Sequence, residues 1–250
     1  PTYEQLRETH NDRVEHLARV HGIGVVELEW TEDGQHHFEQ GDAELWLEMP
    51  RRTALRISKL GDTLLWIGSD EERYWSFNLL EDPTRLSRHG HDEPFAAGGV
   101  PIRPLVLLTA MGLTPLPPAD DPDLPPDVSW VRGEDGEGAG WMISVPPAPG
   151  ETDQVTMVFD DPGRRPQRVV VRDRDGRDVV SSVLEDYVTV TTPGMSPLAA
   201  PKMSGAARIT DPASASEIRL YLREWSADVE HQPMANVFDL DKLTRSMRPE

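Results

Sequence analysis

The stretch GDAELWLEMPRRTALRISK, residues 41–59, carries the clearest strand pattern in the chain. Before Pro50, apolar side chains fall on every second residue, at Ala43, Leu45, Leu47 and Met49. Since successive side chains of a strand point to opposite faces, this period of two places one apolar row on one face. The proline ends the strand, and TALRISK (53–59) begins another. The stretch therefore predicts two neighbouring strands of one sheet.

Strand patterns continue on both sides of this stretch. Upstream, VVELEW (25–30) alternates apolar and acidic residues, and Asp33-Gly34 supplies a hairpin turn before HHFEQ (36–40). Downstream, TLLWIG (63–68) and RYWSFNL (73–79) follow after short polar turns. Consecutive strands on short loops pair most simply in chain order, so residues 23–79 are predicted to form an antiparallel meander.

The residues before the meander have the spacing of a helix. Over residues 1–22 the apolar positions form one stripe, consisting of Tyr3, Leu6, Val14, Leu17 and Val20. Only His10 interrupts this stripe, and Gly22 and Gly24 are predicted to end the helix. The sequence therefore predicts an amphipathic helix at the N-terminus.

Residues 80–127 interrupt the strand patterns. No periodicity is seen over residues 80–100, whereas IRPLVLLTAMGL (102–113) is mostly apolar and predicts a short buried helix. The following TPLPPADDPDLPPD (114–127) is a loop that no regular element can cross. This region is therefore expected to form a loop and a helical lid.

Strand patterns return over residues 128–250. They are VSWVRG, WMISVP, QVTMVF, RVVVRD, VVSSVLEDYVTVT, ARIT, EIRLYLREW and ANVFDLDKL. GEDGEGAG (133–140) and Asp175-Gly176 are predicted to close two hairpins. We therefore predict one domain, residues 1–250, of the mainly β (α+β) class. Its architecture is a strongly curved antiparallel sheet or incomplete β-barrel, with the N-terminal helix and the helical insert on the concave face.

The composition excludes several classes of function. A net charge of −19 over 250 residues argues against nucleic acid as a partner, because phosphate contacts need a basic surface. No apolar run reaches the roughly 18 residues of a membrane-spanning helix, and the absence of cysteine excludes disulfides and thiolate metal sites. Because the sequence begins at Pro1, we expect that a signal or lipid-attachment segment has been removed.

The polar stretch SRHGHDEP (87–94) is the strongest chemical candidate. Its Arg-His-Gly triplet occurs in the nucleophile loop of histidine phosphatases, and His89, His91 and Asp92 offer metal ligands. The phosphatase fold needs alternating strands and helices, and a metal site usually needs a ligand held by a rigid element. We interpret the stretch as a solvated loop at the pocket mouth, where the two histidines would sense pH. A metal-dependent hydrolase is the weakest alternative.

The other polar motifs have simpler explanations. His36 and His37 are adjacent on a strand and point to opposite faces, so they cannot bind one metal together. DRDGRD (173–178) fits a hairpin turn better than a calcium loop, and DDPD (120–123) fits a solvated acidic loop. Since no nucleophile or phosphate-binding motif is present, the sequence predicts a non-enzymatic protein with no cofactor and no metal.

The apolar rows of the meander predict a ligand pocket. A curved sheet closed by helices can enclose more volume than its side chains fill, and such a space binds apolar ligands. The predicted lining consists of alternating strand residues and two lid residues, namely Val26, Leu28, Trp30, Phe38, Leu45, Leu47, Leu55, Ile57, Leu65, Ile67, Trp75, Phe77, Leu108 and Met111. The alternative is that these residues simply fill a core.

Several strings resemble the periplasmic lipoprotein carrier and receptor family (LolA/LolB-like). The Gly-x-Leu-x-Leu-x-x-Pro strand pair of that family is matched by Gly41, Leu45, Leu47 and Pro50. Its Asp-Gly-x-x-x-Trp-x-Tyr/Phe motif is similar, without the glycine, to Ser69, Asp70, Tyr74, Trp75 and Phe77. VTMVFDDPGRRPQRVVVRDRDGRDVVSSVLEDYVTV and NVFDLDKL are similar to the closing strands, so the resemblance spans nearly the whole chain.

This resemblance implies an incomplete antiparallel barrel lidded by helices. It also implies a periplasmic protein, or one lipid-anchored at the outer membrane, that holds a lipid or lipoprotein acyl chain in an apolar cavity. The carriers have an arginine directly before the proline of the first motif, where this chain has Met49, with Arg51 and Arg52 after the proline. This departure and the long 80–127 region favour a relative that binds another hydrophobic ligand. The alternative is an envelope scaffold whose acidic surface binds a protein partner.

Overall fold

The computed structural model describes residues 1–32, 34–79, 84–91, 104–118, 127–132, 139–145, 153–160, 165–212, 215–227 and 234–247. The helices are α1 (Tyr3–His16), α2 (Pro104–Ala110), α3 (Met234–Val237) and α4 (Leu240–Met247). The main sheet has thirteen strands, in the spatial order β6 (Arg85–Gly90), β5 (Arg73–Asn78), β4 (Asp62–Ser69), β3 (Arg52–Lys59), β2 (Gln35–Glu48), β1 (Arg19–Glu32), β15 (Ser216–Ser226), β14 (Ala206–Asp211), β11 (Asp178–Glu185), β10 (Pro166–Arg172), β9 (Gln154–Phe159), β8 (Gly140–Val145) and β7 (Asp127–Val131). A small sheet pairs β12 (Val188–Thr189) with β13 (Lys202–Met203).

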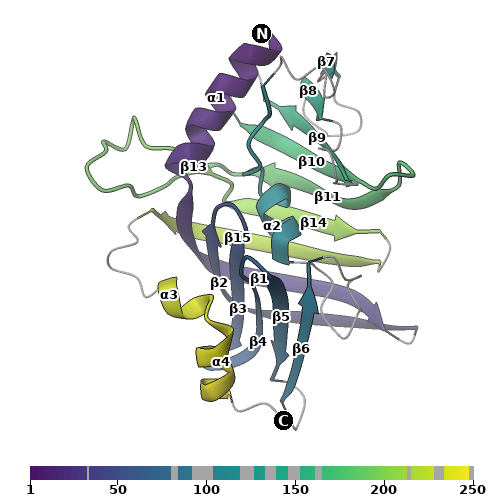
Figure 1. Ribbon diagram of the computed structural model, residues 1–250, viewed down its shortest axis with the longest axis vertical. Coiled ribbons are helices and arrows are strands. Elements are labelled where there is room, and N and C mark those ends of the chain that lie inside the picture. The colour runs from purple at the N-terminus through teal and green to yellow at the C-terminus, as the bar shows by residue number, and fades with distance from the viewer. Residues whose placement is uncertain are drawn as a thin grey trace.

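The main sheet is antiparallel, curved and open (Figure 1). β6 and β7 occupy its two ends and do not pair with each other, so the barrel is incomplete. Helix α2 contacts β3 and β4 of the first meander and also β10 and β11 of the second. These strand pairs are far apart in the sheet, so the sheet must curve around α2 for both to reach it. The predicted class, curvature and helical insert on the concave face are confirmed.

Two apolar clusters lie on opposite faces of the first meander. The larger one combines the concave face of the sheet with α2 and with Leu6 and Leu17 of the N-terminal region. The smaller one lies on the convex face of β2–β5 and is covered by α3 and α4 through Phe238, Leu240 and Leu243. The sheet is therefore packed on both faces over these strands.

The start of β1 differs from the prediction. Helix α1 ends at His16, and Gly22 and Gly24 lie inside β1 rather than ending a helix. A Cβ atom on Gly24 would lie 1.9 Å from the Tyr221 carbonyl oxygen of β15, and the strand register shifts between Ile23 and Gly24. These glycines are therefore explained by the close approach of β15 and not by a helix end.

Two further segments differ in secondary structure. Residues 85–90, predicted to be irregular, form the edge strand β6, which pairs with β5 along its whole length. Its polar composition hides the strand pattern and is typical of an edge. The terminal ANVFDLDKL (235–243), predicted to be a strand, instead spans most of α3 and the first half of α4. Leu240, Leu243 and Met247 follow a helical spacing. The alternation of apolar and polar residues around Phe238 fits a strand equally well and conceals this spacing.

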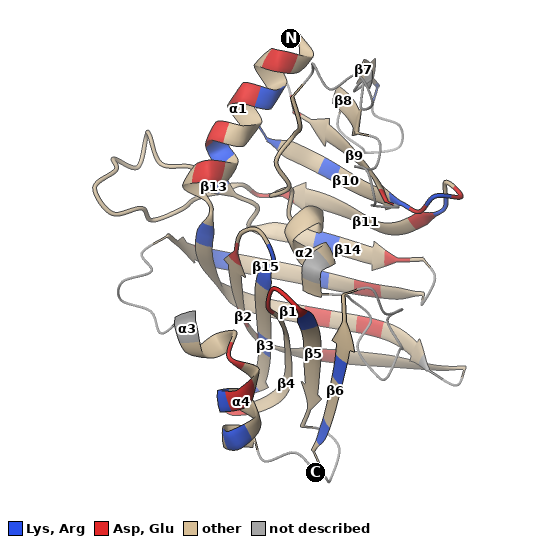
Figure 2. Ribbon diagram, viewed as in Figure 1, with Lys and Arg blue, Asp and Glu red and all other residues tan. Residues whose placement is uncertain are grey.

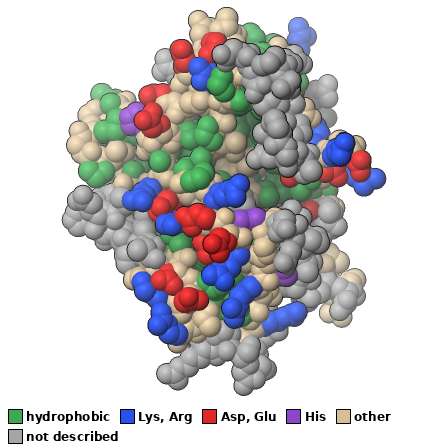
Figure 3. Space-filling model, in the orientation of Figure 1, with side chains coloured by type: hydrophobic (Ala, Val, Ile, Leu, Met, Phe, Trp, Pro, Cys, Tyr) green, Lys and Arg blue, Asp and Glu red, His purple; other side chains and the backbone are tan. Residues whose placement is uncertain are grey.

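Charged residues occur along α1, α4 and the strands (Figure 2). On the face shown in Figure 3, acidic and basic side chains of the described residues are intermixed rather than gathered into one acidic patch. Ion pairs such as Arg52–Glu71, at 2.6 Å, account for part of this mixing. In the described part of the chain, no helix combines the length and the apolar character needed to cross a membrane.

Candidate functional site

The concave face beneath α2 contains most of the predicted ligand-binding residues. Eight strand residues of the set belong to its cluster together with Leu108 and Met111, namely Val26, Leu28, Leu45, Leu47, Leu55, Ile57, Leu65 and Ile67. Trp30 packs against the same cluster and is half-buried. The fold therefore brings eleven of the fourteen predicted residues to one face.

Phe38, Trp75 and Phe77 do not face this cluster, so their predicted position was wrong. Phe38 is 52% exposed, and it lies seven residues before Leu45 on the same strand, an odd spacing that places them on opposite faces. Phe77 lies directly opposite Trp66, and Trp75 opposite Gly68, which places both aromatic side chains in the convex cluster beneath α4. The register of the β4–β5 hairpin decides this, and sequence spacing within β5 cannot reveal it.

Helix α2 packs on the concave face through buried apolar side chains. Leu107, Leu108 and Met111 belong to the same cluster as the strand residues, and each of the three is at most 4% exposed. The structure thus describes an apolar face covered by α2.

Polar side chains of α1 hold the segment that follows α2. Asn11 donates to the Leu116 carbonyl at 2.9 Å and accepts the Leu116 backbone N–H at 2.8 Å. The Tyr3 hydroxyl donates to the Pro117 carbonyl at 2.7 Å, and Arg13 donates to the Gly112 carbonyl. These bonds fix the end of α2 against α1.

His10 also belongs to this set of contacts. It is the residue that interrupts the apolar stripe in the sequence, and it is fully buried. Its Nε2 atom lies 2.9 Å from the Thr114 carbonyl, and its ring packs edge-on against Phe159 with 5.3 Å between centroids. Burial, together with the nearby charge of Arg13, lowers the pKa of His10 to about 3. The imidazole is therefore neutral at pH 7 and donates its Nε2–H to Thr114.

The low pKa of His10 predicts a loss of stability in acid. The unfolded chain binds this proton near pH 6.5 and the folded chain only near pH 3, so the contribution of His10 is complete above pH 6.5 and falls as the pH drops. Between pH 7 and pH 5 the wild type should lose about 2 kcal/mol through this residue. Urea unfolding at both pH values measures the difference.

The matched pair for this measurement is His10→Gln and His16→Gln. Glutamine can still donate to Thr114 but does not titrate, so His10→Gln should lose most of this pH dependence. His16 is exposed on the same helix, and its variant should behave as the wild type. An unchanged pH dependence in His10→Gln would contradict the assignment.

The histidines of the stretch 87–94 lie on β6 and directly after it. His89 stacks on Tyr74 with 5.1 Å between ring centroids, and His91 lies 6.4 Å from the same ring. The His91 Nε2 atom is 2.9 Å from the Asp70 carbonyl oxygen. These contacts place both rings against β5 instead of in a solvated loop, while the pH-sensing role stays a prediction.

The remaining polar candidates show no assembled metal site. In the described residues, no group of three His, Asp or Glu side chains is arranged to hold a metal ion. His37 stacks on Trp30, whereas His36 approaches Glu29 at 3.7 Å, so these neighbours point to opposite faces as predicted. Asp92 and the stretch 120–123 lie outside the described residues.

DRDGRD forms the predicted hairpin turn between β10 and β11. One oxygen of the Asp173 carboxylate accepts the backbone N–H groups of Asp175 and Arg177, each at 2.9 Å. Gly176 has a φ of 77°, a left-handed conformation that favours glycine. The acidic residues of this stretch therefore stabilise a turn.

Comparison with known proteins addresses the fold. No protein-family model and no curated protein matches the sequence. A DUF1329 family protein from Desulfovibrio piger matches with a TM-score of 0.60 and 10% identity, over 96% of this chain and 98% of that one. A LolA superfamily protein from Nitrosomonas europaea matches with a TM-score of 0.52 and 10% identity, over 96% and 99% of the two chains. The chain has a LolA-like fold.

A third solved structure extends the comparison. A domain assigned to the outer membrane lipoprotein-sorting proteins, from Vibrio parahaemolyticus, matches with a TM-score of 0.59 and 10% identity. The match covers 96% of this chain and 97% of the Vibrio domain. The LolA-like fold thus extends over nearly the whole chain, as the sequence motifs indicated, while the low identity makes this chain a divergent example.

Proposed function

We propose that the protein is a non-enzymatic cell-envelope protein that binds a lipid or another hydrophobic ligand on the concave face of its sheet. The observation that carries this proposal is the continuous apolar cluster beneath α2 in a LolA-like fold. Burying one methylene group contributes about 0.8 kcal/mol, so an acyl chain of roughly ten methylenes supplies micromolar affinity.

Helix α2 acts as the lid in this proposal. It has seven residues, too few to be stable alone, so its position depends on the side chains that pack beneath it. An acyl chain would take the place of Leu107, Leu108 and Met111 against the strands. Ligand binding and the closed position of α2 then compete for the same apolar surface.

A solved structure of the same fold supports the proposed envelope location, and Met49 bears on the kind of ligand. One structure with this fold is named for outer membrane lipoprotein sorting, which supports a periplasmic or lipid-anchored protein with a lipid or lipoprotein as its partner. Met49, which replaces the arginine of the carriers, packs partly buried against the concave cluster. An apolar contact at this position favours a ligand other than a shuttled lipoprotein.

Competition between lid and ligand predicts the effect of Leu108→Ala. This substitution weakens the packing of α2 on the strands, so cis-parinaric acid displaces the helix more easily. Its affinity should rise about tenfold for each ~1.4 kcal/mol of packing free energy that α2 loses. The matched control is Leu243→Ala on α4, which removes the same atoms from the convex cluster. Fluorescence titration of the two variants and the wild type measures the three affinities.

Two results would contradict the proposal. One is a wild-type protein that takes up no cis-parinaric acid and carries no co-purifying amphiphile in native mass spectrometry. The other is an equal change of affinity in Leu108→Ala and Leu243→Ala, because the convex cluster has no role in the proposed site.

A further inference from the structure

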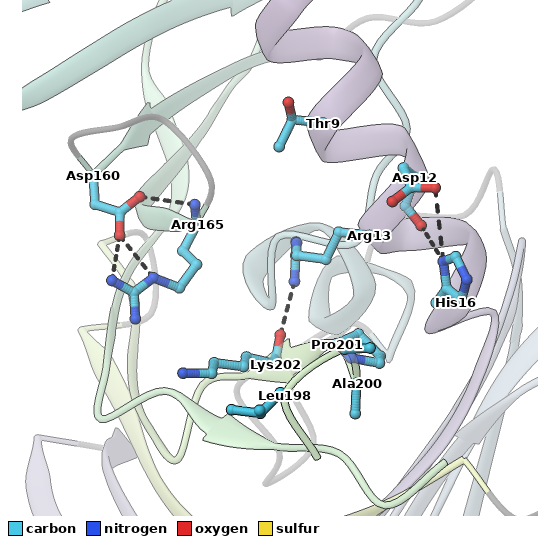
Figure 4. Close-up of a pocket in the computed structure, with 11 residues that line it drawn as sticks. Thr9, Asp12, Arg13, His16, Asp160, Arg165, Leu198, Ala200, Pro201 and Lys202 are labelled. Carbon is cyan, nitrogen blue, oxygen red and sulfur yellow. Dashed lines mark hydrogen bonds and ion pairs between the residues drawn. The ribbon is translucent and has the colours of Figure 1, made fainter. Parts of the chain in front are cut away.

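A polar pocket lies between α1 and the segment 198–202, outside the apolar face (Figure 4). Its volume is about 510 Å³, within the range of pockets that bind small molecules. Helix α1 contributes Arg13 and Asp12, and Asp160 and Arg165 form the facing wall. The pocket is thus built from three parts of the chain that are distant in sequence.

Arg13 is the unusual residue of this pocket. It is only 8% exposed, and among the described residues its guanidinium makes no ion pair with a carboxylate. It donates to two backbone carbonyls, those of Gly112 and Lys202, the latter at 3.4 Å, while its Nε atom has no hydrogen-bond partner. A buried charge without a counter-ion is costly, so a ligand that supplies the negative charge would be bound favourably.

The other charged groups do not neutralise Arg13. The Asp160 carboxylate is occupied by Arg165, with a guanidinium Nη2–Oδ2 distance of 2.6 Å and the Arg165 backbone N–H on its other oxygen at 2.9 Å. Asp12 faces His16 and is largely exposed. In Figure 4 Arg13 lies between these two pairs. Lys202 is exposed and makes no ion pair within the described part of the chain, which leaves the pocket with an excess of positive charge.

We infer that this pocket binds a phosphate group, with the Arg13 guanidinium and the Lys202 ammonium as its main contacts. A guanidinium offers several N–H donors in a plane that matches phosphate oxygens, and Arg13 lines the pocket. The volume exceeds what phosphate alone requires, so the group belongs either to a phospholipid headgroup or to free phosphate. The inference does not depend on the apolar face.

Calorimetric titration with inorganic phosphate tests the pocket directly. Arg13→Gln should weaken phosphate binding at least tenfold, because glutamine keeps a donor for the backbone carbonyls but not the charge. Lys202→Gln should weaken it severalfold without touching the core, which keeps the test valid if Arg13→Gln folds poorly. Arg172→Gln is the matched control, since it removes one positive charge from a partly exposed arginine that pairs with Asp178 away from the pocket.

A second titration identifies the source of the phosphate. Dihexanoylphosphatidylglycerol below its critical micelle concentration should bind more tightly than inorganic phosphate if the ligand is a headgroup, and equally if it is free phosphate. In both cases Arg13→Gln or Lys202→Gln must weaken binding. Absence of phosphate binding by the wild type overturns the inference, as does equal binding by the pocket variants and Arg172→Gln. If both pocket substitutions weaken phosphate binding but leave lipid binding unchanged, the lipid binds elsewhere and the pocket is assigned to free phosphate.

Discussion

Replacing Gly24 with alanine should destabilise the protein by more than about 4 kcal/mol, a large part of the stability of a domain of this size. The added Cβ would lie 1.9 Å from the Tyr221 carbonyl oxygen and 2.8 Å from the Leu222 Cα atom. Both are backbone atoms of β15, so no side-chain rotation relieves the clash. β1 and β15 join the two meanders, and their separation would split the sheet. Urea unfolding followed by circular dichroism measures the loss.

Gly34→Asn is the control for this prediction. Gly34 has a φ of 75°, and no described residue other than its chain neighbours lies within 4 Å of an added Cβ. Asparagine tolerates the left-handed conformation. Its variant should lose less than about 1 kcal/mol. If Gly24→Ala were as stable as Gly34→Asn, the close contact of β1 with β15 would be refuted.

Trp75→Ala should cost about 3–5 kcal/mol and leave the affinity for cis-parinaric acid unchanged. The indole of Trp75 is fully buried on the convex face, where it covers Gly68 so closely that a Cβ there would lie 2.7 Å from it. Its loss therefore opens a cavity beneath α4 and not on the concave face. Unfolding curves and fluorescence titration of the folded variant give the two quantities.

Leu55→Ala is the matching substitution on the concave face and is compared with Trp75→Ala on the convex face. Leu55 is also fully buried, but it belongs to the concave cluster. Its variant should be destabilised by about 2–5 kcal/mol and should also bind cis-parinaric acid less tightly, because contact surface is removed from the proposed site. Equal ligand affinity in the two variants would refute the concave face as the binding surface.

The extent of sequence prediction differs between the sheet and the site. The alternation at Leu45 and Leu47 predicts an apolar face, because neighbouring residues of a strand always point to opposite sides. The position of Phe38 follows from the same rule, and its odd spacing to Leu45 already excludes a shared face. Trp75 is different, since its face depends on the register in which β5 pairs with β4.

In the helices, too, some features can be predicted from the sequence and others depend on tertiary contacts. The apolar stripe of α1 predicts the helix, and His10 stands out in it as the one polar interruption. What His10 contacts cannot be predicted from that spacing, because Thr114 is distant in sequence and approaches only when the segment after α2 folds against α1. The strand prediction for residues 235–243 failed because a short apolar run fits both the strand period and the helix period until its neighbours are known.

Local period and composition are enough to predict the antiparallel meanders, the apolar rows and the acidic charge. The LolA-like motifs likewise indicated the fold from the sequence. The faces of Trp75 and Phe77, by contrast, depend on the pairing of β5 with β4, which the structure supplies. The structure also places Arg13 beside the Gly112 and Lys202 carbonyls without a carboxylate partner in the described chain. These features depend on hairpin register and on contacts between distant residues, which no local pattern encodes.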